Sequence, residues 1–156
     1  MKLIDSLDPR LIIAELAATT KTGVLEEISE LLSTRLGQAN GSPSKAHILE
    51  VLLERERLGS TGIGHGVALP HGRLPGLSRL LLGLGRSPAG VEFDSADGRP
   101  VNLFFLLLSP EGSTRHLLAL AALANVLREG GVRERLLSAA SAQDMYEELL
   151  RALGGA

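Results

Sequence analysis

Two apolar runs constrain the fold of this chain more strongly than any other feature. They are RLLLGLGR at residues 79–86 and PVNLFFLLLS at residues 100–109. Short, continuous apolar runs of this kind are typical of strands buried within a sheet. The segments before and after them carry apolar residues at helical spacing instead. Because strands lie between helical segments, the pattern predicts an α/β or α+β arrangement around a mixed sheet.

The chain begins with one ambiguous segment and a clear helix. LIIAEL (11–16) fits either a buried strand or a short helix, since periodicity does not separate the two. Thr20 is a suitable N-cap for a helix that extends to about Leu36. The apolar residues at helical spacing in this helix are Val24, Leu25, Ile28, Leu31 and Leu32.

A loop and a second helix follow. GQANGSP (37–43) has the composition of a loop, and Ser44 or Ser42 then caps a helix that ends near Gly59. The remaining expected elements are a strand at VALP (67–70), a turn at LPGL (74–77) and helices at roughly 113–128, 132–140 and 142–152.

The composition is that of a single domain spanning residues 1–156. A chain of 156 residues is long enough to bury a core, and with 44% apolar but only 3% aromatic residues that core must be aliphatic. The net charge of −2 argues against a nucleic-acid-binding or anionic-membrane-binding surface, which needs a basic excess. The absence of cysteine excludes disulfides, thiol catalysis and cysteine-ligated metals.

We expect a soluble, cytoplasmic protein with no membrane insertion. The first ten residues contain Asp5 and Asp8 where a signal peptide would need an apolar core. The apolar runs are also far too short to span a bilayer.

The segment STGIGHGVALPHG (60–72) concentrates four glycines and two histidines in one place. Dinucleotide-binding folds place their glycines after a strand and before a helix, whereas these glycines follow a helix and precede a strand. The Gly-Lys-Ser/Thr sequence of a P-loop is also missing. Two interpretations remain: a flexible loop whose backbone N–H groups form an anion-binding nest, or a plain surface turn.

His71 is the candidate nucleophile of this segment. It follows Pro70 at the end of a short apolar strand, and Gly72 leaves one side of its ring open. Proline fixes one backbone dihedral and burial of Val67 and Leu69 fixes the strand direction, so the imidazole is held in position to react. Against this, a histidine alone is more often a surface residue or a hydrogen-bonded core residue.

Two further polar residues lie on apolar helix faces. Arg55 falls on the apolar stripe of its helix, where a charge is costly without an anionic partner. His116 shares a face with Leu120 and Leu123, in a first turn capped by Ser113, where the helix dipole disfavours an imidazolium. The alternatives are that Arg55 extends its head group to solvent and that His116 is a neutral core histidine.

RERLGSTGIGHGVALPHG (55–72) resembles the active-site signature of the fructose/mannitol-type enzyme IIA domain of the bacterial phosphotransferase system, and most closely that of the nitrogen-regulatory enzyme IIA proteins. The similarity continues through DGRPVNLFFLLLSP (97–110), HLLALAALANVL (116–127) and the final helices. This resemblance implies a mixed central sheet flanked by helices on both sides. It also implies that His71 is the phosphorylated histidine, with His116 and Arg55 as its phosphoryl-stabilising neighbours.

The resemblance further implies a phosphotransferase component that accepts its phosphoryl group from the histidine-containing phosphocarrier protein, without a metal or cofactor. Such a transfer needs a neutral nitrogen nucleophile, in-line approach and donors for the phosphoryl oxygens. The loop residues expected near the site are Ser60, Thr61, Gly62, Gly64, His65, Gly66 and Gly72. Relatives usually carry Asn or Glu in place of His65, so we expect it to be exposed and to modulate transfer rather than catalyse it.

Three functional alternatives stay open. Sugar-transport versions of this family pass phosphate to a cysteine-dependent IIB domain and a membrane IIC domain, neither of which is expected to be fused to this chain. That favours the nitrogen-regulatory type, which acts on regulatory target proteins, although free-standing sugar-specific IIA proteins that serve a separate IIB protein also exist. A metal or ligand site built from His65, His71 and His116 is the remote alternative, weakened by the lack of carboxylates at ligand spacing.

Overall fold

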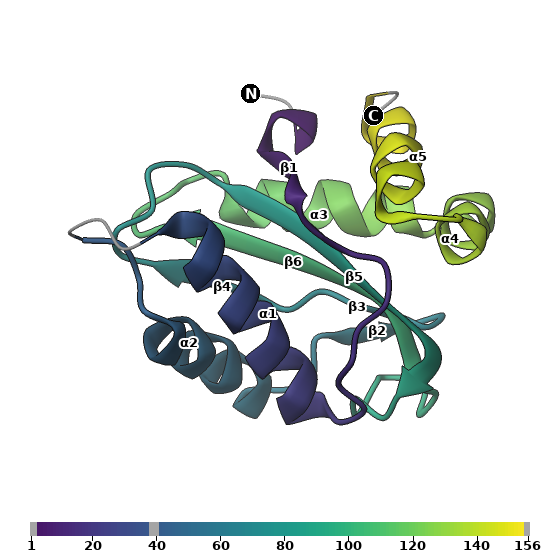
Figure 1. Ribbon diagram of the computed structural model, residues 1–156, viewed down its shortest axis with the longest axis horizontal. Helices are drawn as coiled ribbons and strands as arrows, with labels where there is room; N and C mark the ends of the chain where they lie inside the picture. The colour runs from purple at the N-terminus through teal and green to yellow at the C-terminus, as the bar shows by residue number, and fades with distance from the viewer. Residues whose placement is uncertain (1–2, 38–40, 155–156) are drawn as a thin grey trace.

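One mixed sheet lies between two layers of helices in the computed structural model, which describes residues 3–37 and 41–154 (Figure 1). The strands are β1 (Leu7–Ile13), β2 (Gly62–Gly64), β3 (Val67–Ala68), β4 (His71–Leu74), β5 (Leu81–Val91) and β6 (Val101–Pro110). The helices are α1 (Lys21–Leu36), α2 (Lys45–Arg57), α3 (His116–Leu127), α4 (Gly130–Ser138) and α5 (Ala142–Gly154), with a short 3₁₀ helix at Leu3–Ser6. The predicted fold class is therefore confirmed.

β6 is the central strand of the sheet. It pairs antiparallel with β5 on one side and parallel with both β3 and β4 on the other, while β1 extends the sheet beyond β5. Val67 lies opposite Leu103 and His71 lies opposite Leu107, so β3 and β4 form one interrupted strand broken at residues 69–70. This interrupted strand carries both the end of the glycine-rich segment and His71.

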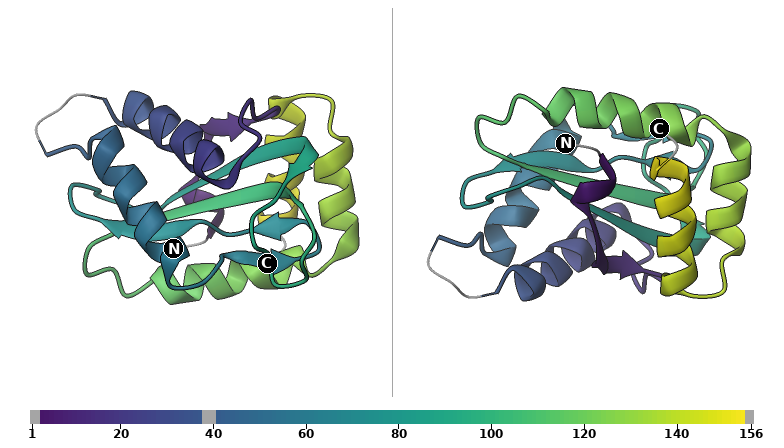
Figure 2. Two further views of the ribbon diagram at one scale, coloured as in Figure 1. Left: turned by 90° about the horizontal axis from the view of Figure 1, so that it is seen from below. Right: turned by 90° about the horizontal axis from the view of Figure 1, so that it is seen from above.

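The side chains of β6 alternate between two hydrophobic cores. One core is formed with α3, α4 and α5 and the other with α1 and α2, and Figure 2 shows these two helix layers on opposite faces of the sheet. The residues of the first set are Leu103, Phe105 and Leu107, and those of the second are Phe104, Leu106 and Leu108. Because both faces of the strand are covered, its sequence is apolar without interruption.

The N-caps expected for the first two helices are present. The Thr20 hydroxyl accepts from the Gly23 N–H at 3.1 Å, and the Ser44 hydroxyl accepts from the His47 N–H at 3.1 Å. Each bond satisfies one backbone donor that a helix N-terminus otherwise leaves free. The first helix also ends at Leu36, as predicted. Of the loop predicted at 37–43, residues 38–40 lie outside the described residues.

Several predicted strand boundaries need correction. Of the ambiguous segment 11–16, residues 11–13 belong to a strand, which begins earlier, at Leu7, and ends at Ile13. The strand predicted at 67–70 ends at Ala68, because the Leu69 N–H bonds to the carbonyl of Thr61 at 3.0 Å instead of continuing the ladder with β6. The run predicted at 79–86 forms a strand that begins at Leu81 and continues to Val91.

The helix predicted at 113–128 begins three residues later, at His116. Ser113 is not its N-cap, since the Ser113 hydroxyl accepts from the Arg115 N–H at 3.2 Å within the preceding turn. Among the described residues, no helix is both long and apolar enough to cross a membrane.

The glycine-rich segment forms a β-hairpin over residues 62–68, so of the two interpretations the flexible loop is wrong. β2 and β3 pair antiparallel, and the turn residues His65 and Gly66 have φ angles of 58° and 76°. Two successive positive φ angles are the signature of a type I′ turn, which explains why glycine is needed there. Gly62 permits close packing, since a Cβ at this position would approach the Ser95 side chain to 2.8 Å.

Candidate functional site

His71 lies at the start of β4, between the two helix layers. The next residue, Gly72, faces α2 so closely that an added Cβ would lie 2.4 Å from Cγ1 of Val51. Because successive side chains of a strand point to opposite faces, His71 points toward the α3 layer, where its ring centroid is 5.4 Å from that of His116. Arg55 reaches the same imidazole from the last turn of α2. The structure thus brings together the three residues predicted to form the centre of the site.

The hydrogen bonds of His71 define its tautomer. Nδ1 lies 2.7 Å from the carbonyl oxygen of Leu69, and Nε2 lies 3.0 Å from Nε of Arg55. A carbonyl oxygen only accepts and a guanidinium only donates, so the proton is assigned to Nδ1 and the lone pair to Nε2. The Nε2 atom of His71 is therefore the available nucleophile.

The surroundings of His71 favour its neutral form. Burial is the main cause that lowers the pKa of this imidazole, and the nearby charge of Arg55 acts in the same direction. The hydrogen bond to the Leu69 carbonyl and the charge of Glu56 oppose the change. Because the lowering effects win, the ring keeps a free lone pair at neutral pH, as nucleophilic attack requires.

Arg55 offers a positive charge whose hydrogen-bond acceptors are neutral. In addition to the bond to His71, its Nη1 donates to the carbonyl oxygen of Gly59 at 2.8 Å. These contacts orient the guanidinium without neutralising it. An anion that reached Nε2 of His71 would therefore meet a preorganised cation.

His116 is the first residue of α3 and is only 5% exposed. Burial, followed by the charges of Arg73 and His71, lowers the pKa of His116 to about 4. The ring is thus neutral near pH 7. Its Nδ1 lies within hydrogen-bond distance of the hydroxyl of Ser109.

Three residues that lie near the site were not identified from the sequence. Arg73 lies two residues after His71, on the same strand face, and its Nη1 donates to the carbonyl of Ser113 at 2.6 Å. The spacing of two residues could have revealed Arg73, because residues i and i+2 of a strand point to the same face. Ser109 was also detectable, as a polar side chain that ends a buried apolar run. Glu56 carried no such signal.

Glu56 is a buried carboxylate that ties the end of α2 to the segment before β2. It accepts from the Thr61 N–H at 3.1 Å and from the Thr61 hydroxyl, and it forms an ion pair with Lys21 at 2.9 Å. Ser60 continues this network by donating to the carbonyl of Phe93 at 2.6 Å. Thr61 in turn accepts from the Leu69 N–H, so the network supports the chain that leads into His71.

The other expected loop residues lie elsewhere. The His65 N–H donates to Asp97 at 3.1 Å, a Cβ on Gly64 would also meet Asp97, and Gly66 packs against Asn102. The hairpin turn precedes Val67. The residues of β6 that lie opposite Val67 and His71 are four positions apart, which corresponds to roughly 13 Å at the usual strand rise. The structure therefore does not bring the turn or His65 to His71. Of the three histidines of the metal-site alternative, only His71 and His116 lie together, and His65 lies apart from them.

The position of His65 leads to a prediction. His65→Asn should leave the phosphoryl transfer that the family resemblance implies for His71 unchanged within about twofold. It should raise stability by a few tenths of a kcal/mol, because asparagine tolerates a positive φ better than histidine. Transfer kinetics and urea denaturation of the variant would measure both effects. A large loss of transfer would show that the turn reaches the site.

Stability should depend on the protonation of the two site histidines. The pKa values of His71 and His116 are lowered by folding, so below about pH 6.5 the unfolded chain binds protons that the folded chain does not. The free energy of unfolding should therefore fall as the pH drops from about 6.5 toward 4, by at most about 1.4 kcal/mol per pH unit for each histidine. Urea denaturation across this interval measures the slope.

His116→Gln is the matching control for this pH dependence. It should flatten the slope, since it removes the histidine that stays neutral down to about pH 4. The carboxylates with lowered pKa values, Asp8 and Asp97, lose their contribution only at still lower pH. An identical slope in the variant would contradict the assignment.

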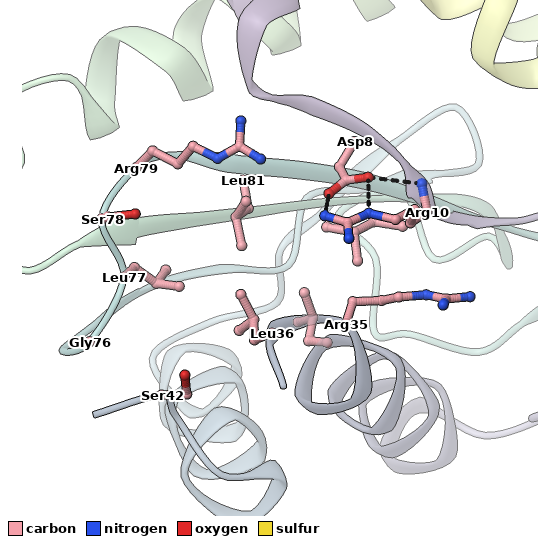
Figure 3. A pocket seen from close by; sticks show the side chains of 12 residues that line it. Asp8, Arg10, Arg35, Leu36, Ser42, Gly76, Leu77, Ser78, Arg79 and Leu81 are labelled. Atoms are coloured by element: carbon pink, nitrogen blue, oxygen red, sulfur yellow. Dashed lines mark hydrogen bonds and ion pairs between the residues drawn. The ribbon is translucent and has the colours of Figure 1, made fainter. Parts of the chain in front are cut away.

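A hollow at the β1 edge of the sheet is a separate feature (Figure 3). Its volume is about 210 Å³, and its charged lining consists of Asp8, Arg10, Arg35 and Arg79. Arg10 pairs with Asp8 at 2.8 Å, and Arg35 lies in the last turn of α1, where a cation complements the helix dipole. Asp8 and the helix dipole offset only part of the charge of the three arginines, and none of the predicted site residues lines the hollow.

Comparison with known proteins gives one family and two kinds of relatives. Residues 5–152 match the family model described as "Phosphoenolpyruvate-dependent sugar phosphotransferase system, EIIA 2". A nitrogen regulatory protein of Bradyrhizobium diazoefficiens is 39% identical over 96% of this chain and 95% of the relative. A fructose-specific EIIA component of Haloferax volcanii is 34% identical over 94% of each chain. The crystal structure of nitrogen regulatory protein IIA-Ntr from Neisseria meningitidis superposes with a TM-score of 0.85 at 36% identity, covering 94% of this chain and 98% of that one.

Proposed function

Because the chain belongs to the EIIA 2 family of the phosphoenolpyruvate-dependent sugar phosphotransferase system, we propose that it is a phosphocarrier that accepts a phosphoryl group on Nε2 of His71. The observation that carries this proposal is the pair of hydrogen bonds made by the imidazole. Nδ1 is held by the Leu69 carbonyl, and Nε2 faces the guanidinium of Arg55 with its lone pair. The donor is the histidine-containing phosphocarrier protein.

In the proposed step, the lone pair of His71 Nε2 attacks the phosphorus atom of the donor's phosphohistidine. The new N–P bond forms as the donor's N–P bond breaks, and the donor imidazole leaves with its electron pair. The Nδ1–H of His71 stays on the Leu69 carbonyl, which stabilises the positive charge that develops on the ring. Arg55 releases Nε2 and moves its hydrogen bonds to the phosphoryl oxygens.

The charges around His71 suit an incoming phosphoryl group. Arg55 and Arg73 supply two cations near the rings, and His116 supplies a neutral ring on the other side. This arrangement stabilises a dianion through positioned donors, which is the main source of catalysis in phosphoryl transfer.

The surface beside the site suits a protein donor. Leu117 and Leu118, which follow His116 on α3, are each 72% exposed, and Leu58 at the end of α2 is 84% exposed. Exposed leucines are typical of protein-contact surfaces. Leu117 directly follows His116 and Leu58 comes three residues after Arg55, so both are close in the chain to residues that contact His71.

The proposed role is regulatory, with the phosphorylation state of His71 controlling the binding of target proteins. The identity with the Bradyrhizobium nitrogen regulatory protein supports this role over nearly the whole chain. The second candidate is a sugar-specific component that passes its phosphoryl group to a separate IIB protein. The identity of 34% with the Haloferax fructose-specific component favours that candidate.

One experiment tests the transfer and then separates the roles. Incubation with phosphoenolpyruvate and the donor proteins should add one phosphoryl group, seen as a single acid-labile increase in intact mass. Addition of a fructose-type IIB protein should then leave most of that group in place if the role is regulatory. Rapid loss to IIB would support the sugar-specific role, and no uptake from the donor would contradict the phosphocarrier function itself.

A further inference from the structure

A buried serine lies behind the second histidine of the site. Ser109, near the end of β6, is fully buried at 0% exposure, and its hydroxyl is hydrogen-bonded with Nδ1 of His116. It lies opposite Arg73 in β4, just as Leu107, two residues earlier, lies opposite His71. Ser109 therefore shares the sheet face from which His71 and His116 approach each other.

The direction of this hydrogen bond follows from the needs of a buried hydroxyl. Nδ1 of His116 is the partner that the structure gives the Ser109 hydroxyl among the described residues. If His116 donated from Nδ1, the serine proton would be left without an acceptor inside the core, which costs free energy. Donation from Ser109 to Nδ1 avoids this cost, and it requires that the proton of the neutral imidazole be on Nε2.

We propose that Ser109 is a positioning residue that holds His116 as the Nε2–H tautomer, so that His116 donates a hydrogen bond to the phosphoryl group on His71. This inference rests on the proposed function, because the phosphoryl group is the acceptor in question. Phosphoryl oxygens only accept, so a bare Nε2 would repel them. Nε2 is on the edge of the ring away from Ser109, and the His116 ring lies 5.4 Å from that of His71.

The tautomer matters because His116 is neutral. A protonated imidazole would donate from both nitrogens, and a serine behind it would have little influence on Nε2. Burial together with the charges of Arg73 and His71 lowers the pKa of His116 to about 4, so only one nitrogen carries a proton near pH 7. The hydroxyl of Ser109 then decides which one.

The tautomer can be observed without any phosphate. In ¹⁵N-detected imidazole spectra of the unphosphorylated wild-type protein at pH 7, His116 should show a protonated Nε2 and an unprotonated Nδ1. In Ser109→Ala, the Nδ1 signal should shift toward the protonated form as the two tautomers mix. A wild-type His116 protonated on Nδ1, or an identical tautomer in the variant, would overturn the inference.

The rate of phosphoryl transfer provides a second test of the role of Ser109. Ser109→Ala should slow phosphoryl uptake about five- to tenfold, the effect of weakening one hydrogen bond to the transferred group, and Ser109→Thr should restore most of the rate. Ser95→Ala is the matched control, since Ser95 is also buried and its hydroxyl has no partner among the described side chains and backbone groups. Its rate should not change.

These two arms distinguish the inference from the function on which it rests. If the wild type accepts the phosphoryl group but Ser109→Ala transfers at the wild-type rate, the role of Ser109 is wrong and the phosphocarrier function stands. If the wild type accepts nothing from the donor, both fail.

Discussion

His71→Asn is expected to abolish phosphoryl uptake and leave the fold intact. An amide nitrogen has no available lone pair for attack on phosphorus, whereas Nε2 of His71 has one, held beside Arg55. Removing a nucleophile typically costs several orders of magnitude, so we expect at least about a 10⁴-fold loss. Asparagine also keeps polar contacts in a half-buried position. Intact mass after incubation with the donor system, together with a thermal melt, measures both outcomes.

His47→Asn is the control for this prediction, because His47 lies on α2 outside the site and should not influence uptake. The structure also predicts the atom that is modified. Nuclear magnetic resonance of the phosphorylated wild type should place phosphorus on Nε2, because Nδ1 is occupied by the Leu69 carbonyl. Uptake that persists in His71→Asn, or phosphorus on Nδ1, would contradict the assignment.

Local rules predicted the elements that are set by nearby residues. The caps at Thr20 and Ser44 and the helix end at Leu36 follow from side chains within a few positions of the bonds they make. The apolar run that forms β6 followed from burial on both faces, because every residue there must avoid water whichever way it points. Such features can be read from a single sequence.

The hairpin could not be predicted in the same way. Its turn is fixed by contacts with residues distant in the chain, including a bond between the His65 N–H and Asp97, 32 positions away. GxGxG suits a flexible loop as well as a type I′ turn, and only its neighbours decide between them. The expectation that the turn approaches His71 failed for this reason.

The residues at the centre of the site were easier to predict than the residues that hold them in place. Arg55 and His116 could be singled out because a polar residue on an apolar helix face needs an explanation. Ser109 and Glu56 act through a second residue, one by contacting His116 and the other by holding Thr61. Ser109 could have been singled out as a polar residue at the end of an apolar run, but the partner of each residue depends on packing and does not follow from the sequence alone.

Arg86→Met is expected to cause the largest loss of stability of any single change considered for this chain. Arg86 is only 9% exposed in β5, and its guanidinium donates to the carbonyl of Ala14 at 2.9 Å, to that of Leu136 at 2.9 Å and to that of Ala139 at 2.7 Å. It thereby joins the chain after β1 to the end of α4. Methionine keeps the apolar stem but leaves these carbonyls without their donor.

The size of the effect follows from the burial of the acceptors, since the bond to Leu136 is buried and those to Ala14 and Ala139 are partly buried. Each buried polar group left unpaired costs about 1–3 kcal/mol and a partly buried one costs less, so we expect a loss of about 2–4 kcal/mol from a total stability of order 5–15 kcal/mol. Arg133→Met is the matched control, because Arg133 also donates to carbonyls at a helix end, those of Leu127 and Arg128, but from a more exposed position. It should cost about 1 kcal/mol, because water can replace the lost donor. Urea denaturation of both variants decides the matter: equal losses would mean that Arg86 adds nothing beyond an ordinary helix cap.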